Sequence, residues 1–443
     1  MNKFQDFKKI HFIGIGGIGM SALAGLLLKH GKEISGSDRS LSKITKDLSD
    51  KGVKVFNLES KSNIDSSCDL VIYTPAVSEE HPEILTAKSL GIKIISYPEA
   101  LGLISEEFFT VAVSGTHGKT TTTAMIIHVL DELGRSPNAI VGSLIKGKDG
   151  NEDSNFRFGK EDIFIVEACE YKRSFLKLSP DVLVINNIEE DHLDYYKNIS
   201  DIKDSFRDFV QCLPKKGVLI SSFDKDNVGS VISAFKGSFI DFKNYNINGT
   251  VFPFGGEHNR SNAQTAIAVL DVLGISTKES INSLKTFPGT WRRFEYKGKT
   301  KKGAMVFDDY AHHPSEVLAT IKAAKEKYPD KNINIVFQPH LYSRLSFFFN
   351  DFINSLSGAD VTVLTPVYQA RDEDNSFSYS SDDLFDALVR RGRVSYKVSS
   401  LRDAVKKVLE ISDIDSIVIM MGAGDIYTKT LELVEKNEPK VIL

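Results

Sequence analysis

Short apolar runs recur along the whole chain, and stretches with helical periodicity separate them. The first series of runs covers residues 9–15, 34–38, 53–56, 69–74 and 92–95. The second series covers 109–113, 163–166, 182–185 and 218–220, and the third covers 304–307, 333–337, 361–364 and 417–420. Buried strands that alternate with helices are typical of parallel, doubly wound sheets. The pattern therefore predicts an α/β protein with three domains.

The breaks between the three series place the domain boundaries. A chain of 443 residues is too long for one core, since a domain takes roughly 150 residues. Joints are expected at 104–108 and at 287–291, where Pro288 and Gly289 interrupt the pattern. We expect a Rossmann-like domain over 1–107, a central P-loop ATPase domain with a mostly parallel sheet over 108–290, and a Rossmann-like domain over 291–443.

Composition narrows the class of protein. Acidic and basic side chains nearly cancel, 59 against 55, so no affinity for nucleic acid or for an anionic membrane is expected. The chain has no run of 18 apolar residues and no apolar leader at its start, which predicts neither a membrane span nor secretion. The three cysteines, Cys68, Cys169 and Cys212, lie far apart and suit the reducing cytoplasm.

The first glycine-rich loop follows the first apolar run. It reads Gly14-Ile15-Gly16-Gly17-Ile18-Gly19 and precedes a helix predicted over 20–30. Such glycines let the backbone approach a pyrophosphate, whose charge then lies at a helix N-terminus. Asp38 closes the next apolar run, where its carboxylate could accept a hydrogen bond from a ribose or a base. A tight turn without a ligand is the alternative.

The second loop is more specific. It reads Ser114-Gly115-Thr116-His117-Gly118-Lys119-Thr120-Thr121, again between a strand and a helix. Backbone N–H groups can surround phosphates here, Lys119 can reach the β- and γ-phosphates, and the Thr120 hydroxyl can bind Mg²⁺. Val113 occupies the first glycine position of the usual P-loop, so the loop is a shortened relative of it.

The two loops together constrain the reaction. An NAD-dependent dehydrogenase would use only the first loop, and a simple ATPase would use only the second. A nucleotide-regulated binding protein without chemistry is a further alternative. An enzyme with two phosphate-bearing ligands accounts for both loops.

Further segments make the chain resemble the Mur ligases, which build the peptide stem of peptidoglycan. The first loop, extended to His11–Ser21, resembles the UDP-binding loop of the alanine-adding branch, and Gly115–Thr123 resembles the ATP loop of the family. Five more clusters follow in the family's order, at 167–171, 256–262, 291–295, 308–314 and 337–344. The resemblance spans nearly the whole chain.

The resemblance implies a reaction and its substrates. L-alanine would be joined to UDP-N-acetylmuramate through an acyl phosphate, with ATP and Mg²⁺, in the cytoplasm and by a monomer or homodimer. The recycling ligase that attaches a whole tripeptide to the same acid shares both loops and is the nearest alternative. Folate and polyglutamate ligases lack the first loop.

The resemblance also assigns residues. The catalytic set would be Lys119, Arg293, His192 and Glu167, and the metal would be bound by Thr120, Glu167 and His192. The UDP substrate would lie on Gly14, Gly16, Gly17, Gly19 and Asp38, and the amino acid on His312, His340 and Arg344. ATP would contact Gly115, Thr116, His117, Gly118, Lys119, Thr120, Thr121, Asn259, Asn262, Arg293 and Asp309.

Some of these assignments have a competing physical explanation. Glu167 ends a buried strand, where α/β proteins place ligands, but it could be an exposed strand-end carboxylate. His192 lies in an acidic loop, and imidazole is an unusual Mg²⁺ ligand. Asn259 and Asn262 share a helix face, yet Asn259 could instead cap that helix.

The chain departs from the family pattern at two places. Cys169-Glu170-Tyr171-Lys172 stands where Asp-Glu-Ser-Asp is common, and Leu341 stands where an arginine is common. The first departure leaves the carboxylate of Glu167 in place, whereas the second affects the predicted amino-acid pocket. No lysine clearly matches the carbamylated lysine of other branches, as expected for the alanine-adding branch.

Overall fold

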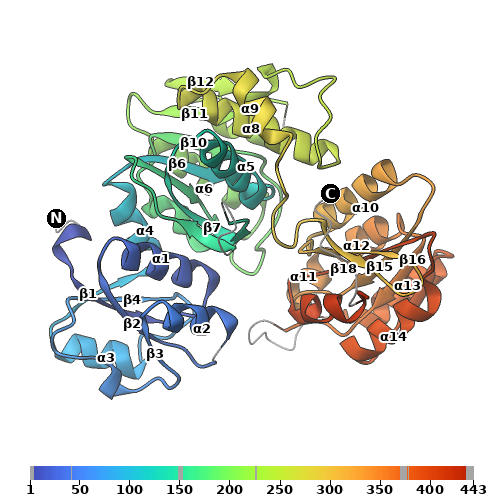
Figure 1. The fold of residues 1–443 in the computed structure, drawn as a ribbon, viewed down its shortest axis with the longest axis horizontal. Coiled ribbons are helices and arrows are strands. Elements are labelled where there is room, and N and C mark those ends of the chain that lie inside the picture. Colours follow the sequence, from blue (N-terminus) through green and yellow to red (C-terminus); the bar gives the residue numbers. More distant parts are fainter. Residues whose placement is uncertain are drawn as a thin grey trace. The chain divides into compact units, whose positions relative to one another are not determined.

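The structure is a computed structural model, and it describes residues 4–40, 42–147, 153–224, 227–369, 377 and 379–435. Three mostly parallel sheets confirm the predicted α/β class (Figure 1). The chain divides into two compact units. The first comprises Met1–Glu189, Ser200–Asn246 and Asn262–Leu284, and the second comprises Glu190–Ile199, Ile247–Ser261 and Lys285–Leu443. The predicted domain boundaries at 107/108 and 290/291 remain predictions.

The first sheet is entirely parallel, with the order β3-β2-β1-β4-β5. Its strands are β1 (Lys9–Ile13), β2 (Glu33–Ser37), β3 (Lys54–Phe56), β4 (Leu70–Tyr73) and β5 (Lys93–Ser96). Its helices are α1 (Ile18–Lys29), α2 (Lys43–Asp50), α3 (Pro82–Ser89) and α4 (Tyr97–Ser105). The strand order reverses between β1 and β4, so the first glycine loop, which follows β1, lies at the switch point where such sheets bind ligands.

The second sheet has the order β12-β11-β10-β6-β9-β7-β8, and only β7 and β8 pair antiparallel. Its strands are β6 (Phe109–Ser114), β7 (Asn138–Ile145), β8 (Ser154–Arg157), β9 (Ile163–Glu167), β10 (Val182–Ile185), β11 (Val218–Ser221) and β12 (Ser238–Asp241). The associated helices are α5 (Lys119–Glu132), α6 (Ile199–Gln211), α7 (Val228–Ile232), α8 (Glu257–Val272) and α9 (Thr277–Leu284). Because β6 lies between β9 and β10, the second loop and Glu167 emerge at the same sheet edge.

The third sheet lies in the second unit, with the order β13-β14-β18-β15-β16-β17. Its strands are β13 (Glu295–Lys299), β14 (Met305–Asp309), β15 (Asn332–Phe337), β16 (Val361–Leu364), β17 (Val394–Lys397) and β18 (Ser416–Met421). Its helices are α10 (Pro314–Lys327), α11 (Tyr342–Phe347), α12 (Phe349–Leu356), α13 (Ser381–Arg390) and α14 (Leu401–Ile411). Only β13 runs antiparallel to its neighbour.

Alternation along β18 shows why the third sheet is covered on both faces. Ile417, Ile419 and Met421 belong to one buried cluster, and Val418 and Met420 belong to another. Successive side chains of a strand point to opposite faces, so each face of this sheet has its own apolar core. The first cluster also takes in residues of α10, α12 and α13, and the second takes in residues of α14.

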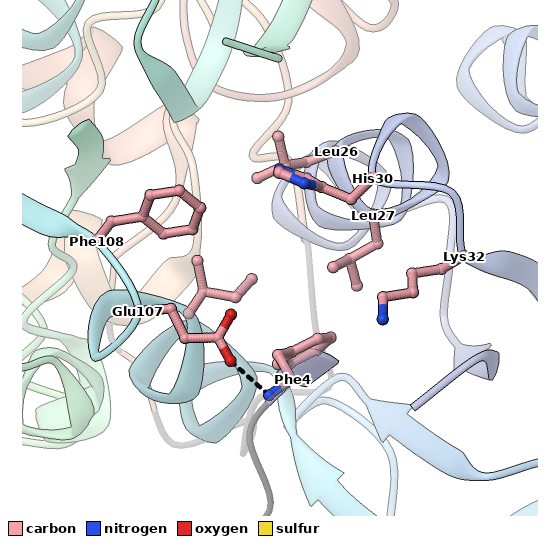
Figure 2. Close-up of a pocket in the computed structure, with 8 residues that line it drawn as sticks. Phe4, Leu26, Leu27, His30, Lys32, Glu107 and Phe108 are labelled. Carbon is pink, nitrogen blue, oxygen red and sulfur yellow. Dashed lines mark hydrogen bonds between the residues drawn. The ribbon is translucent and has the colours of Figure 1, made fainter. Parts of the chain in front are cut away.

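An apolar pocket of about 220 Å³ lies within the first unit (Figure 2). Leu26 and Leu27 of α1, Ile104 of α4 and Phe108 line it, and the Glu107 carboxylate accepts a hydrogen bond from the Phe4 backbone N–H at 2.7 Å. The pocket adjoins the C-terminal ends of α1 and α4. In a parallel sheet these ends lie at the edge opposite the strand carboxyl ends, so the pocket is remote from both glycine-rich loops.

Among the helices of the described residues, none is both long and apolar enough to span a bilayer.

Candidate active site

The first glycine-rich loop is held by its own neighbours. Gly14 has φ = 80°, and a Cβ there would lie 2.5 Å from Cγ2 of Thr74, so only glycine fits. The Gly16 N–H donates to Oδ2 of Asp38 at 2.8 Å, and the Ser40 N–H donates to Oδ1 at 3.1 Å. Asp38 therefore shapes the loop, and its contact with a substrate stays a prediction.

Tyr97 is a neighbour of this loop that the sequence did not single out. A Cβ on Gly19 would lie 2.6 Å from the Tyr97 phenol oxygen, so the ring packs on the backbone of α1. Burial raises the pKa of Tyr97, and the nearby carboxylate of Glu167 raises it further. The phenol thus lies between the first loop and the carboxylate that the sequence assigns to the metal.

The second loop is anchored by the segment after β10. The Thr116 N–H donates to the carbonyl of Asn187 at 3.1 Å, and the His117 N–H donates to its side-chain Oδ1 at 2.8 Å. Nε2 of His117 lies 3.4 Å from the Glu189 carboxylate. Gly118 precedes the first residue of α5 and has φ = 81°. Thr121 lies in the first turn of that helix.

Lys119 is enclosed and already paired. Its Nζ donates to the carbonyls of Gly115 at 2.6 Å and Thr116 at 3.1 Å, and to both carboxylate oxygens of Glu170, at 3.1 and 2.9 Å. Burial alone would lower the pKa of Lys119, but the Glu170 carboxylate raises it above its ordinary value. The lysine is therefore a fixed positive charge at the start of α5.

Thr120 and Glu167, both predicted as metal ligands, are in contact in the structure. The Thr120 hydroxyl donates to Oε1 of Glu167 at 2.8 Å, and the Gly142 N–H donates to Oε2 at 2.8 Å. A hydroxyl and a carboxylate in contact form the hard oxygen set that Mg²⁺ prefers. His192, the third predicted ligand, belongs to the second unit, and its role as a ligand of the same ion stays a prediction.

The two asparagines of α8 differ in their surroundings. Asn262 is buried, and its side-chain oxygen would lie 2.4 Å from a Cβ placed on Gly118, so it adjoins the second loop. Nδ2 of Asn259 donates to the carbonyl of Gly255 at 3.0 Å, just before the helix. Asn259 is the third residue of α8, and this contact is a donation to a carbonyl, so it is not the N-cap interaction that the alternative proposed.

The contact between Gly118 and Asn262 allows a matched test. We expect Gly118→Ala to raise the KM for ATP by about tenfold or more, because the methyl group displaces Asn262 in addition to straining the backbone. Gly134→Ala is the control, since Gly134 has φ = 74° but no atom within 4 Å of an added Cβ. Steady-state kinetics with varied ATP measures the difference, and equal effects of the two variants would contradict the assigned contact.

In the second unit, the two predicted ATP residues are adjacent in space. Nη1 of Arg293 lies 3.7 Å from Oε1 of Glu316. The Asp309 carboxylate accepts hydrogen bonds from the backbone N–H groups of Phe294 and Ala311, both at 2.7 Å. Burial raises the pKa of Asp309 to about 6. Asp309 is the last residue of β14, and its hydrogen bond to the Phe294 N–H fixes the segment that carries Arg293.

Arg292, the neighbour of Arg293, has a structural environment that the sequence did not reveal. Its side chain is 2% exposed, and its Nε donates to Oδ1 of Asp308 at 3.2 Å. Nη2 donates to the carbonyl of Gly422. The guanidinium also lies 4.6 Å from the ring centroid of Tyr427. Nothing in the spacing of two consecutive arginines distinguishes the buried one from the accessible one.

The three predicted amino-acid residues come together in the second unit. Nη1 of Arg344 lies 3.1 Å from Nδ1 of His340, and the rings of His340 and His312 are 5.8 Å apart between centroids. Burial lowers the pKa of His312 to about 3, so its ring is neutral at pH 7. Arg344 also contacts Asp191, with Nη2 and Oδ1 3.0 Å apart. The sequence did not predict this last contact.

Comparison with known proteins identifies the family. The Mur ligase family catalytic domain matches residues 9–109, the Mur ligase middle domain matches 113–252, and the Mur ligase glutamate ligase domain matches 292–424. The chain belongs to the Mur ligase family. The predicted resemblance is confirmed, and so is the predicted class of ATP-dependent, amide-bond-forming ligases.

Relatives within the Mur ligase family match over nearly their full length. The UDP-N-acetylmuramate–L-alanine ligase of Caldanaerobacter subterraneus subsp. tengcongensis is 39% identical, over 98% of this chain and 99% of that protein. The protein of the same name from Clostridium acetobutylicum is 41% identical, over 95% and 96% respectively.

Solved structures show the same Mur ligase architecture. The UDP-N-acetylmuramate–alanine ligase of Thermotoga maritima is 28% identical with a TM-score of 0.76, covering 96% of this chain and 98% of that one. A murein peptide ligase from Psychrobacter arcticus is 23% identical with a TM-score of 0.70, covering 98% and 100%, and it shows the fold alone.

Proposed function

We propose that this Mur ligase joins L-alanine to UDP-N-acetylmuramate, consumes ATP and releases ADP and phosphate, in the synthesis of peptidoglycan precursors. The observation that carries the proposal is the full-length similarity to ligases of that name. The paired Thr120 and Glu167 beside Lys119 support it with a site suited to phosphoryl transfer. Cys68, Cys169 and Cys212 are free thiols, which supports action in the reducing cytoplasm.

The proposal gives each domain a role. Residues 1–107 would bind the UDP substrate through Gly14, Gly16, Gly17 and Gly19. Residues 108–290 would bind ATP, and residues 291–443 would bind the amino acid and part of the ATP. We propose a monomer or a homodimer, without nucleic acid or membrane partners.

The chemistry begins with activation of a poor electrophile. A carboxylate resists attack by an amine, so its oxygen first attacks the γ-phosphorus of ATP. The bond from this phosphorus to the bridging oxygen breaks, ADP leaves, and an acyl phosphate forms. Lys119 and Arg293 would stabilise the charge that develops on the transferring phosphoryl group, mostly by position and electrostatics. The amino group of L-alanine, once its ammonium has lost a proton, then attacks the acyl carbon. The C–O bond to phosphate breaks, phosphate leaves, and the nitrogen loses a second proton to give the amide. No nucleophile of the protein is required.

The residues present fit a divalent metal ion. Thr120 and Glu167 already place a hydroxyl and a carboxylate in contact, and we propose that they hold Mg²⁺, with His192 as a further ligand. Mg²⁺ would supply charge stabilisation to the phosphate oxygens. Lys119 adds a fixed cation there, because Glu170 keeps it protonated.

The amino-acid site would place a neutral imidazole near the incoming amino acid. His312 is neutral at pH 7, since burial holds its pKa near 3, and it therefore adds no repulsion to a bound L-alanine. We propose that Arg344 binds the alanine carboxylate and that His312 and His340 line the site. Closure around the acyl phosphate would exclude water that could hydrolyse it.

Phosphate release tests the proposed function. We expect release by the purified protein only when ATP, Mg²⁺, UDP-N-acetylmuramate and L-alanine are all present. Release that needs a tripeptide instead of L-alanine would favour the recycling ligase. No phosphate release with either amine would contradict the proposed substrates.

A further inference from the structure

The guanidinium of Arg344 is bound by a carboxylate of its own chain. Nη2 donates to Oδ1 of Asp191 at 3.0 Å, and the two side chains are 7% and 9% exposed. The pair is therefore largely removed from water, where breaking it without a replacement is costly.

The segment that carries Asp191 also covers this side of Arg344. Residues 190–199 belong to the second unit, and Leu193 packs on its apolar core. The space left between this segment and Leu341, Phe347 and Phe348 is about 10 Å³, which is room for about one water molecule. An amino acid cannot reach Asp191's side of the guanidinium while the segment remains there.

Asp191 does not bind all the N–H donors on its side of the Arg344 guanidinium. It takes only Nη2, whereas Nε of Arg344 is buried and has no hydrogen-bond partner within the described residues. The Nε and Nη2 groups lie on one edge of the guanidinium and together match the two oxygens of a carboxylate. A free carboxylate that binds both atoms would make a bidentate pair, which is stronger than the single contact of Asp191.

We propose that Asp191 is an internal competitor for the amino-acid carboxylate: it holds Arg344 in the absence of the amino acid and is displaced when the amino acid binds. This inference rests on the proposed function, because it takes Arg344 as the carboxylate-binding residue. The exchange replaces one ion pair by another, so the buried guanidinium is never left without a counter-charge. The proposal concerns the α-carboxylate of a free amino acid, which the first residue of a peptide does not carry.

Displacement of Asp191 has a consequence along the chain. The same Oδ1 atom accepts a hydrogen bond from the His192 N–H at 2.7 Å, and His192 has φ = 54°, a conformation that most residues avoid. Movement of the Asp191 carboxylate therefore removes a contact that holds His192. Binding of the amino acid is in this way coupled to the position of the 190–199 segment.

The test compares two variants, each of which replaces one of two consecutive carboxylates with the neutral amide. Asp191→Asn keeps the shape of the side chain and removes the competing charge, so we expect L-alanine to bind at least about fivefold more tightly. Glu190→Gln is the control, since Glu190 is exposed and lies one residue away. The affinity of this variant for L-alanine should equal that of the wild type. Titration calorimetry with L-alanine, on enzyme that holds UDP-N-acetylmuramate and a non-hydrolysable ATP analogue, measures the affinity.

Unchanged or weaker binding by Asp191→Asn would overturn the proposal and make Asp191 a residue that only orients Arg344. If the variant does not fold, hydrogen exchange of the wild type decides: the His192 amide should exchange faster with L-alanine than without it, and equal or slower exchange would overturn the proposal. Failure of the proposed function would appear separately, as a wild-type enzyme without alanine-dependent phosphate release.

Discussion

Replacing Lys119 with alanine is expected to lower ligation by about 10³-fold or more, because a preorganised charge on the transferring phosphoryl group is lost. Affinity for UDP-N-acetylmuramate should stay unchanged, since the first loop is held by Asp38 and not by Lys119. Phosphate release gives the rate, and calorimetry with the UDP substrate gives the affinity. Normal turnover in the variant would contradict the assigned role.

The partner of Lys119 requires a control. Glu170 is 3% exposed, so the alanine variant leaves a buried carboxylate without its counter-charge and can lose stability for that reason alone. The double variant Lys119→Ala/Glu170→Gln removes that charge as well. We expect it to recover stability without recovering activity. Restored turnover in the double variant would show that the lysine acts only through folding.

The regular part of the fold could be predicted from the sequence. The predicted strands 182–185 and 361–364 coincide with β10 and β16, since fully buried parallel strands read as continuous apolar runs. Five strands escaped prediction: β7, β8, β12, β13 and β17. β13 and β17 are edge strands with exposed lysines, Lys299 and Lys397, which break the apolar pattern.

Only the part of the site that lies at the carboxyl ends of neighbouring strands could be predicted from the sequence. Thr120 and Glu167 meet because β6 and β9 are neighbours whose carboxyl ends share an edge. The counter-charges could not be predicted, because Glu170 lies 51 residues from Lys119 and Asp191 lies 153 residues from Arg344. Neither spacing belongs to a local pattern.

Two carboxylates that the sequence assigned to ligands also accept hydrogen bonds from backbone groups of the protein, and their contacts with ligands stay predictions. Asp38 accepts from the first glycine-rich loop, and Asp309 accepts from the segment after Arg293. A sequence shows that an acidic residue follows a strand, but not which N–H groups surround it. By contrast, Lys119 and Arg344, the two buried cations assigned to substrates, each pair with a carboxylate of the protein, so neither is an uncompensated buried charge.

Replacing Arg292 with methionine is expected to lower the free energy of unfolding of the second unit by about 3–5 kcal/mol, because the buried Asp308 loses its partner. Burial already raises the pKa of Asp308, and Arg292 opposes that rise. Trp291 is the single tryptophan of the chain and precedes Arg292, so its fluorescence during urea unfolding reports on this region. The double variant Arg292→Met/Asp308→Asn should be more stable than the single variant, because it carries no unpaired charge.

Arg293→Met supplies the matched control, since it removes the same functional group from the next residue. Its side chain is 29% exposed and lies 3.7 Å from Glu316, a pair worth less than about 1 kcal/mol. We therefore expect Arg293→Met to unfold at nearly the wild-type urea concentration yet to lose most of its turnover. Arg292→Met should show the larger loss of stability. Equal unfolding midpoints for the two variants would contradict the structural role assigned to Arg292, since its burial would then contribute no more to stability than that of Arg293.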